Sequence, residues 1–110
     1  MRDSQSGGAL TETTFLILLA FCKPIHGYGV ISFIRERTMG RLDLGAGTVY
    51  GAINNLLKKG WIKVAKEKEG RNKTTYIITD QGRRILNTEL FRLKVICSIA
   101  DKVLEENEMG

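Results

Sequence analysis

The chain has 110 residues and a mass of 12.3 kDa, which is enough for one domain of ordinary size and too little for a second core. Hydrophobic residues make up 43% and charged residues 26%, with a single proline, so the composition excludes a disordered or fibrous chain. Lys and Arg number 17 against 12 Asp and Glu, which gives a net charge of +5.

The first predicted helix covers Leu10 to Cys22, which is apolar on nearly every face and is therefore expected to be covered on several sides. Thr11 is the expected N-cap, and Lys23-Pro24 ends the helix because proline cannot continue it. The apolar run from Phe15 is far shorter than the roughly 20 residues of a membrane span. The N-terminus also lacks the apolar stretch of a signal peptide, so we expect a cytoplasmic protein without a membrane partner.

The second predicted helix covers Gly27 to Met39. Val30 and Ile34 recur at helical spacing, and the charged residues 35–37 lie on the opposite side. Gly40 is the expected stop. This pattern predicts an amphipathic helix.

The third predicted helix, Ala46 to Lys59, has one apolar stripe and one polar face, and Gly60 follows it where a left-handed cap is expected. The stripe consists of Val49, Ile53, Leu56 and Leu57. The outer face consists of Gly47, Gly51, Asn54, Asn55 and Lys58, with Thr48 and Tyr50 at its edges. A glycine inside an exposed helix costs about 1 kcal/mol relative to Ala, so this pair favours close approach of another surface over helix stability.

A β-hairpin is predicted next. The alternating pattern puts Ile62 and Val64 on one side of the first strand and Trp61, Lys63 and Ala65 on the other. Thr75 to Thr79 is the second strand, and residues 69–72 have turn composition. Residues 58–73 hold seven basic and two acidic side chains, which matches the net charge of +5 of the whole chain. We expect this basic patch to meet a polyanion, and the alternative is a solvated hairpin without a partner.

The last predicted helix begins after Thr79, its expected cap, and covers about 28 residues, or roughly 42 Å. Its heptad seam consists of Leu86, Leu90, Leu93, Cys97, Ala100 and Leu104, widened by Ile85, Ile96, Ile99 and Val103. A domain of this size cannot cover such a helix alone, so we expect a second copy of the chain to cover the remainder. The alternative is a helix that folds wholly onto its own domain or frays after Leu104.

The chain has few Cys and His residues, the types that often bind metals or act in catalysis. Cys22 and Cys97 lie in apolar segments without metal-ligand spacing, so we expect two buried small hydrophobes rather than a zinc site or a redox pair. His26 is the only histidine and is expected to stabilise a turn rather than to bind metal. No catalytic grouping and no phosphate-binding glycine loop is present, so we expect no enzyme, no metal and no cofactor.

The order of three helices and a basic hairpin is that of a winged helix-turn-helix. We therefore expect a mainly α fold with a small β-hairpin (α+β) and a long C-terminal dimerisation helix. The expected division is a flexible tail over residues 1–9, a DNA-binding domain over 10–79 and the dimerisation helix over 80–110. In this arrangement the third helix enters the major groove, where Asn54 and Asn55 are suited to read base edges, and the hairpin lies on the sugar-phosphate backbone.

Three stretches of the sequence resemble the PadR-like transcriptional regulators: FLILLAFCKPIHGYGVISFI, GTVYGAINNLLKKGWI and GRNKTTYIITDQGRRIL. The short C-terminal segment is similar to the compact subgroup of this family, which has a single dimerising helix. The resemblance implies a homodimeric regulator, usually a repressor, that binds an inverted-repeat operator. By position it implies that Tyr28, Thr48 and Tyr50 contact DNA or orient the helix, and that Arg71 and Lys73 belong to the wing tip. The ring of Tyr28 is equally suited to pack over the helical turn.

The sequence departs from the family pattern at three places. Gly45-Ala46 stands where Ser-Pro is frequent, so the usual side-chain cap is absent, and Gly51 replaces a frequent proline. The wing has one aromatic ring fewer and less charge at residues 73–76. These departures bear on the operator sequence and the affinity more than on the fold.

Some family members bind flat aromatic effectors between the dimer halves, one of them through a Trp of the C-terminal helix. The only Trp here is Trp61, at the wing, so that site does not transfer. Phe15 and Phe91 are suited to border an effector pocket, although aromatic residues at helical spacing are more often part of a core. A small aromatic effector therefore stays an unidentified partner.

Two sets of residues follow from these interpretations. The predicted DNA-binding residues are Tyr28, Gly47, Thr48, Tyr50, Asn54, Asn55, Lys58, Lys66, Lys68, Arg71 and Lys73. The predicted dimer-interface residues are Phe15, Leu19, Leu90, Leu93, Ile96, Cys97, Ala100 and Leu104. The alternative to DNA binding is a winged-helix module that binds protein, because the outer face of the third helix has no Arg, the commonest reader of bases.

Overall fold

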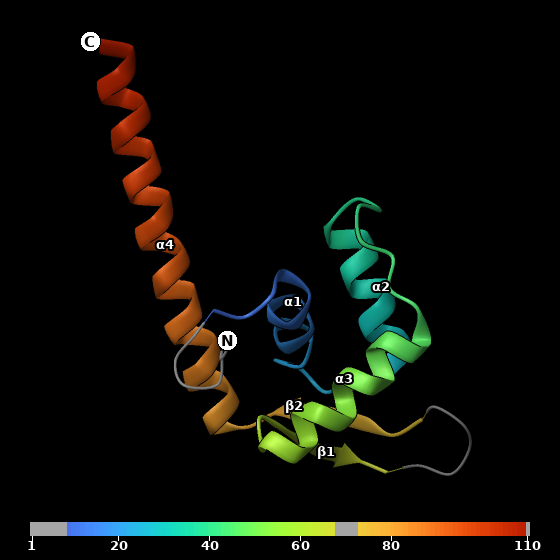
Figure 1. The fold of residues 1–110 in the computed structure, drawn as a ribbon. Helices are drawn as coiled ribbons and strands as arrows, with labels where there is room; N and C mark the ends of the chain where they lie inside the picture. Colours follow the sequence, from blue (N-terminus) through green and yellow to red (C-terminus); the bar gives the residue numbers. More distant parts are fainter. Residues whose placement is uncertain (1–8, 68–72, 110) are drawn as a thin grey trace.

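The computed structural model describes residues 9–67 and 73–109. The elements of these residues, in chain order, are α1 (Glu12–Ala20), α2 (Gly27–Arg37), α3 (Ala46–Lys59), β1 (Ile62–Lys66), β2 (Thr75–Ile78) and α4 (Asp80–Met109). The shorter helices and the two-stranded hairpin form one body, from which α4 extends as a long helix (Figure 1). This is the predicted winged helix-turn-helix, mainly α with a small hairpin.

The start of α1 is the predicted one. The Thr11 hydroxyl accepts a hydrogen bond from the Thr14 N–H at 3.1 Å and so caps the helix. The helix ends earlier than predicted, at Ala20 rather than Cys22, and Phe21 forms its C-cap. This early end places the Phe21 ring in the core, where it is fully buried.

The end of α2 also comes earlier than predicted, at Arg37 rather than Met39. The Thr38 hydroxyl donates to the Ile34 carbonyl at 2.8 Å. Met39 and Gly40 then have φ values of 52° and 81°, a left-handed backbone that cannot continue a right-handed helix. The chain therefore turns before the predicted stop.

The core lies where α1, α2 and α3 meet the base of the hairpin. The predicted stripe of α3 is confirmed, since Val49, Ile53 and Leu56 are buried and Leu57 is half-buried. The buried apolar residues of the described chain are Ile17, Leu18, Ala20, Phe21, Val30, Ile34, Val49, Ile53, Leu56, Trp61, Ile62, Ile78 and Leu86. Their packing fixes the outer face of α3 relative to the hairpin.

The hairpin pairs antiparallel, with Ile62 opposite Ile78, and its register shifts between Val64 and Lys66. The two predicted faces of β1 do not correspond to one buried and one exposed side, because Trp61 and Ile62 are both buried whereas Val64 is 46% exposed. The cause is that only the start of β1 touches the core, so beyond Ile62 both faces of the strand meet solvent.

An isolated β-bridge outside the two strands supports the hairpin, and the sequence patterns do not indicate it. Ile25, in the connection between α1 and α2, pairs with Tyr76 of β2. Its N–H donates to the Tyr76 carbonyl at 3.2 Å, and the Tyr76 N–H donates back at 3.0 Å. The Ile78 N–H also donates to the Phe21 carbonyl, at 2.8 Å. The base of the wing is therefore bonded to the end of α1 and to the following turn.

The last helix, α4, has 30 residues and begins as predicted, with the Thr79 hydroxyl accepting from the Gly82 N–H at 3.1 Å. Gly82 allows the first turn to pack on the wing base, because a Cβ there would lie 2.2 Å from the Trp61 carbonyl oxygen. The helix does not fold wholly onto its own domain and does not fray after Leu104. The alternative of a fully covered or shortened helix is therefore wrong.

The predicted burial of both cysteines is wrong in the single chain, because Cys97 is exposed and Cys22 is half-buried. Phe91 is 71% exposed and belongs to no core of the described residues. Cys97 lies beyond the short stretch in which α4 packs on its own domain, and Phe91 faces away from that domain. None of the described helices is both long and apolar enough to cross a membrane.

Candidate nucleic-acid interface

The outer face of α3 is uncovered, as predicted. Gly47, Gly51, Asn54 and Lys58 are all exposed and follow one another along the helix at helical spacing. A Cβ built on either glycine would meet no atom within 4 Å. Nothing in the described chain therefore requires glycine at these two positions, and the open space above them is available to a second molecule.

One flank of this face is packed against α2. A Cβ on Gly27 would lie 2.4 Å from the Tyr50 ring, so glycine is needed for this close approach. The rings of Tyr28 and Tyr50 meet edge to face with centroids 6.1 Å apart. Burial raises the pKa of the Tyr50 phenol, and the nearby Tyr28 adds to the shift.

The two tyrosines therefore differ in what they present. Tyr50 is half-buried and orients α3 against α2, whereas Tyr28 is 47% exposed although its ring packs on Tyr50. The contact that the structure shows for the Tyr28 ring is with Tyr50 of α3, and both the packing over the turn and the DNA contact stay predictions. No sequence pattern predicts that Gly27 is needed for the close approach of the Tyr50 ring.

The opposite flank carries Thr48 and Asn55, both exposed. Asn55 borders a small hollow of about 130 Å³ together with Thr14 of α1 and Trp61. Asn54 is exposed and lies on the row of Gly47, Gly51 and Lys58. The structure thus separates the two asparagines, with Asn54 central on the face and Asn55 at its edge.

The ends of the two interface helices are capped differently. The His26 Nδ1 accepts a hydrogen bond from the Gly29 N–H at 2.9 Å and caps α2, which confirms the predicted turn-stabilising role. Gly45 caps α3 without a side-chain hydrogen bond, as its sequence predicts. No group of acidic, Cys and His residues in the described chain is arranged to hold a metal ion.

The wing adds exposed cations beside this face. Lys63, Lys66 and Lys73 are exposed, whereas Lys68 and Arg71 lie outside the described residues. The Lys59 Nζ lies 4.7 Å from the centre of the Trp61 ring, so this lysine is held at the junction of α3 and β1. None of the ion pairs within the described residues engages a lysine of α3 or of the hairpin.

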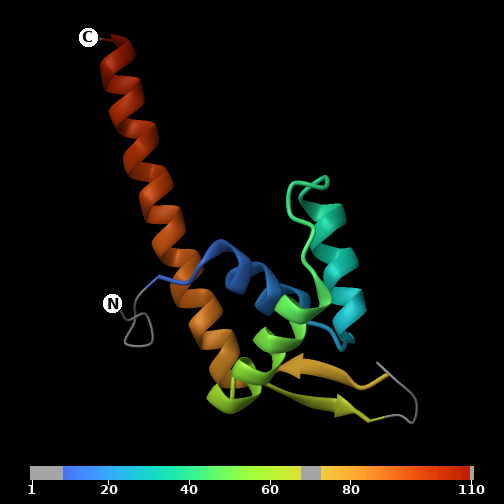
Figure 2. The ribbon, with the colours of Figure 1, turned by 45° about the vertical axis from the view of Figure 1, so that its right-hand side comes forward.

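The interface elements occupy one end of the molecule. Figures 1 and 2 show α3 and the hairpin together at the end opposite to the C-terminal end of α4. The exposed residues of these two elements are together called the basic surface: Gly47, Thr48, Gly51, Asn54, Asn55, Lys58, Lys63, Lys66 and Lys73.

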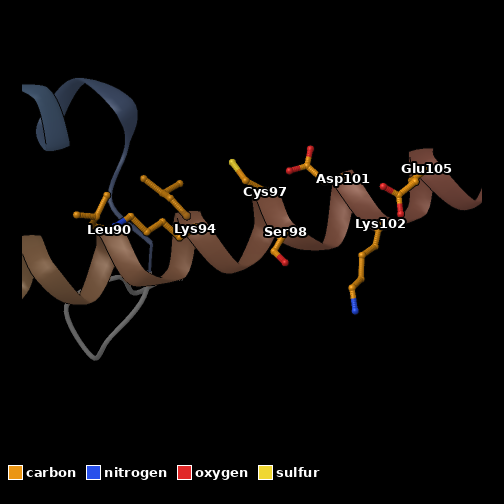
Figure 3. Close-up of a pocket in the computed structure, with 8 residues that line it drawn as sticks. Leu90, Lys94, Cys97, Ser98, Asp101, Lys102 and Glu105 are labelled. Carbon is orange, nitrogen blue, oxygen red and sulfur yellow. The ribbon is translucent and has the colours of Figure 1, made fainter.

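The predicted dimer residues of α4 lie away from this surface. Leu90 and Cys97 point to one side of α4 while Ser98 and Lys102 point to the other (Figure 3). A hollow runs along this part of the helix, and all the residues that border it come from α4, so it is an open strip of helix surface rather than an enclosed cavity. Leu93 is half-buried, and the remaining α4 members of the set are exposed: Leu90, Ile96, Cys97, Ala100 and Leu104.

The two α1 members of the predicted dimer set are half-buried. Leu19 borders a hollow of about 370 Å³ between α1 and α2, together with Cys22 and Phe33. Phe15 borders another hollow of about 370 Å³, between α1 and α4, with Leu16 and Leu93. A volume of this size suits a small molecule, and an aromatic effector there stays a prediction.

The sequence also matches a known protein family. A model of the transcriptional regulator PadR-like family matches residues 15–88. The chain belongs to this family. PadR-like proteins are regulators and not enzymes, which agrees with the absence of a catalytic grouping in the sequence. No curated protein matches the chain.

Solved structures share the PadR-like fold. A transcriptional regulator from Clostridium thermocellum is 26% identical with a TM-score of 0.67, and the match covers 82% of this chain and 86% of that chain. A PadR family regulator from Eggerthella lenta is 24% identical with a TM-score of 0.70, over 84% of this chain and 80% of that one. The PadR of Bacillus subtilis, solved in complex with operator DNA, is 21% identical with a TM-score of 0.59, over 71% of this chain and 46% of that one.

Proposed function

We propose that this PadR-like regulator binds double-stranded DNA as a homodimer, with α3 in the major groove and the hairpin on the sugar-phosphate backbone. The observation that carries the proposal is the uncovered α3 face, with its two open glycines, next to exposed wing lysines. The solved complex of the Bacillus subtilis PadR with operator DNA supports the same use of the fold.

The chemistry of the face suits a duplex. The central Asn54 amide donates and accepts hydrogen bonds, as adenine edges require in the major groove. The glycines let the helix backbone approach the groove floor more closely than any side chain would allow. Lys58, Lys63 and Lys66 are exposed, and contacts from them to phosphates would supply affinity without sequence preference.

A second copy completes the proposal. The apolar face of α4 continues past the point where its own domain covers it, and Ile96 and Val103 are 47% and 55% exposed. Two-fold pairing through equal surfaces is the commonest way for such a face to be covered. Residues 80–110 would then form the dimerisation helix and residues 10–79 the DNA-binding domain. A two-fold dimer of this kind fits an inverted-repeat operator. The family resemblance implies that binding to this operator represses transcription.

The test is a binding titration with promoter DNA from the gene's own locus, repeated at several salt concentrations. We expect binding at low salt with a steep negative slope of log K against log salt, because each phosphate contact contributes about −0.9 to that slope. Asn54→Ala should reduce the preference for the operator over unrelated DNA, while Asn55→Ala at the edge should change it less. Absence of binding at low salt would favour the alternative, a winged-helix module that binds protein.

A further inference from the structure

Glu89 is the buried charged residue of the described chain, with 4% of its surface exposed. It lies on α4, and its carboxylate accepts hydrogen bonds from the Arg92 guanidinium at 2.9 Å and 2.5 Å. The same carboxylate accepts a hydrogen bond from the backbone N–H of Leu10 at 3.2 Å. It therefore joins α4 to the segment that leads into α1.

The important property of this cluster, which consists of Glu89, Arg92 and the Leu10 N–H, is its position along α4. Arg92 and Leu93 are the last half-buried residues of α4, and residues 94–108 are all exposed. The cluster is thus the final point at which the domain supports the helix. The rest of α4 extends about 24 Å beyond it, at 1.5 Å per residue. Figure 2 shows the segment that leads into α1 reaching α4 part-way along the helix, and the rest of α4 continuing past it.

A change of direction at the last support is amplified along the free helix. A tilt of about 10° there would move the far end by about 4 Å, which exceeds the 3.4 Å rise of one base pair. In a two-fold dimer joined through α4, the same tilt occurs in both halves. The distance between the two α3 helices would then change by a similar or larger amount.

We propose that Glu89 is a positioning residue that fixes the direction of α4 and thereby sets the half-site spacing that the dimer accepts. This inference rests on the proposed DNA-binding function. An apolar side chain at this position would also fill the space, but it would allow α4 to slide or tilt against α1. Arg92 lies on the same helix and holds the Glu89 carboxylate in one orientation, and the bond from the Leu10 N–H is the contact that crosses from α4 to the segment before α1.

The proposal predicts an effect on spacing rather than on binding to one half-site. The experiment measures the affinity of the purified full chain for duplexes in which the spacer between two half-sites is shortened or lengthened by one or two base pairs. A duplex with one half-site serves as reference. We compare the wild-type protein with Glu89→Gln, which keeps the shape and loses the charge. Glu12→Gln, which loses an exposed pair with Arg41, is the matched control.

The wild type and Glu12→Gln should prefer one spacing. In Glu89→Gln the ratio between the best spacing and its neighbours should fall by about fivefold, while affinity for the single half-site stays unchanged. A loss of stability alone would lower all affinities together and leave the ratio as it was. An unchanged ratio in a folded, dimeric Glu89→Gln protein would overturn the proposal, and so would a wild type that accepts every spacing equally.

Arg92→Lys provides a second variant if Glu89→Gln does not fold. It keeps the opposite charge, and the Arg92 side chain is 38% exposed, but the two-point geometry is lost. The same broadening of the spacing profile is expected, and an unchanged profile would overturn the proposal. If the wild type binds none of the duplexes, the proposed DNA-binding function itself fails. If the wild type and the variants share one spacing preference, DNA binding stands and only the proposal on Glu89 fails.

Discussion

Gly51 shows most clearly how a single residue of this chain balances stability against function. It lies inside α3 on a face that no other described residue covers. Glycine in such a position costs helix stability, and here no contact within the described chain compensates for that cost. Its use is explained if the backbone at this point approaches another molecule.

Gly51→Ala should therefore stabilise the fold and weaken DNA binding at the same time. We expect the free energy of unfolding to rise by about 1 kcal/mol, and the affinity for operator DNA to fall because the new methyl group holds the helix away from the groove. Urea denaturation and DNA titration of the same preparation measure the two effects.

Thr88→Ala is the matched control, since it raises helix propensity on an exposed position of α4 that is not part of the basic surface. It should raise stability without changing affinity. If Gly51→Ala kept full affinity, close approach at this glycine would be disproved.

Residues whose role is local can be predicted from the sequence. The Thr11 and Thr79 caps and the left-handed Gly60 follow from near neighbours in the chain and are confirmed. Gly27 and Gly82 are different, because each is required by a residue far away in sequence, Tyr50 and Trp61 respectively. Contacts of this kind leave no periodic signal.

Among the elements, the wing should contribute affinity rather than specificity. Replacing Lys66 and Lys73 by Ala should weaken binding to operator and unrelated DNA alike, and it should flatten the salt slope by about 0.9 for each phosphate that is no longer neutralised. The control is the removal of two lysines of α4, Lys94→Ala with Lys102→Ala, which should leave the slope unchanged. Equal slopes in the wing variant and the wild type would remove the hairpin from the interface.

The junction of α1 and α4 should make stability depend on pH in the acidic range. The hydrogen bonds from Arg92 lower the pKa of the Glu89 carboxyl below its ordinary 4.5 against the opposing effect of burial, and the Leu10 N–H helps to lower it. A carboxyl with a lowered pKa stabilises the folded state above its ordinary pKa, and this stabilisation is lost as the pH falls through the folded value.

The wild type should therefore lose stability between about pH 5 and pH 3 more steeply than Glu89→Gln, which has no proton to bind at this site. Denaturation at fixed protein concentration across this range measures the difference. Glu12→Gln should follow the wild type closely, because the Glu12 carboxyl, although its pKa is also lowered by Arg41, is exposed. If Glu89→Gln and the wild type lost stability equally as the pH falls, the proposed contribution of the Glu89 carboxylate would be contradicted.

The elements themselves are predicted from the sequence to within a few residues, and the hairpin shows the limit. Alternation predicts the strands and puts Val64 on the same side as Ile62, but it does not show where the strand leaves the core, so it does not reveal that Ile62 is buried and Val64 is exposed. The pairing of Ile25 with Tyr76 is invisible for a related reason. A single bridging residue has no period, so only the packed structure reveals it.

In the complete molecule, α4 is expected to join two chains. Ile96→Glu together with Val103→Glu places charges on the part of the apolar face that no described residue of the same chain covers. We expect monomers in sedimentation with the helical content of the domain retained, because burying two unpaired charges at an interface is unfavourable.

Ser98→Glu, which lies opposite Ile96 around α4 at about 100° per residue, should leave the dimer intact. A double variant that still sediments as a dimer would remove this face from the interface. The length of the helix and its seam follow from the heptad pattern. Which part of the seam stays uncovered does not, because that depends on where the domain ends along α4.

The proposed dimer places two α3 faces on one duplex, about one helical turn apart, and a footprint on operator DNA can detect this arrangement. We predict two protected major-groove segments with centres about 10 base pairs apart, on one face of the duplex, with protected backbone flanking each where the wings lie. Protection of a single segment, or of backbone without any major-groove protection, would contradict this arrangement.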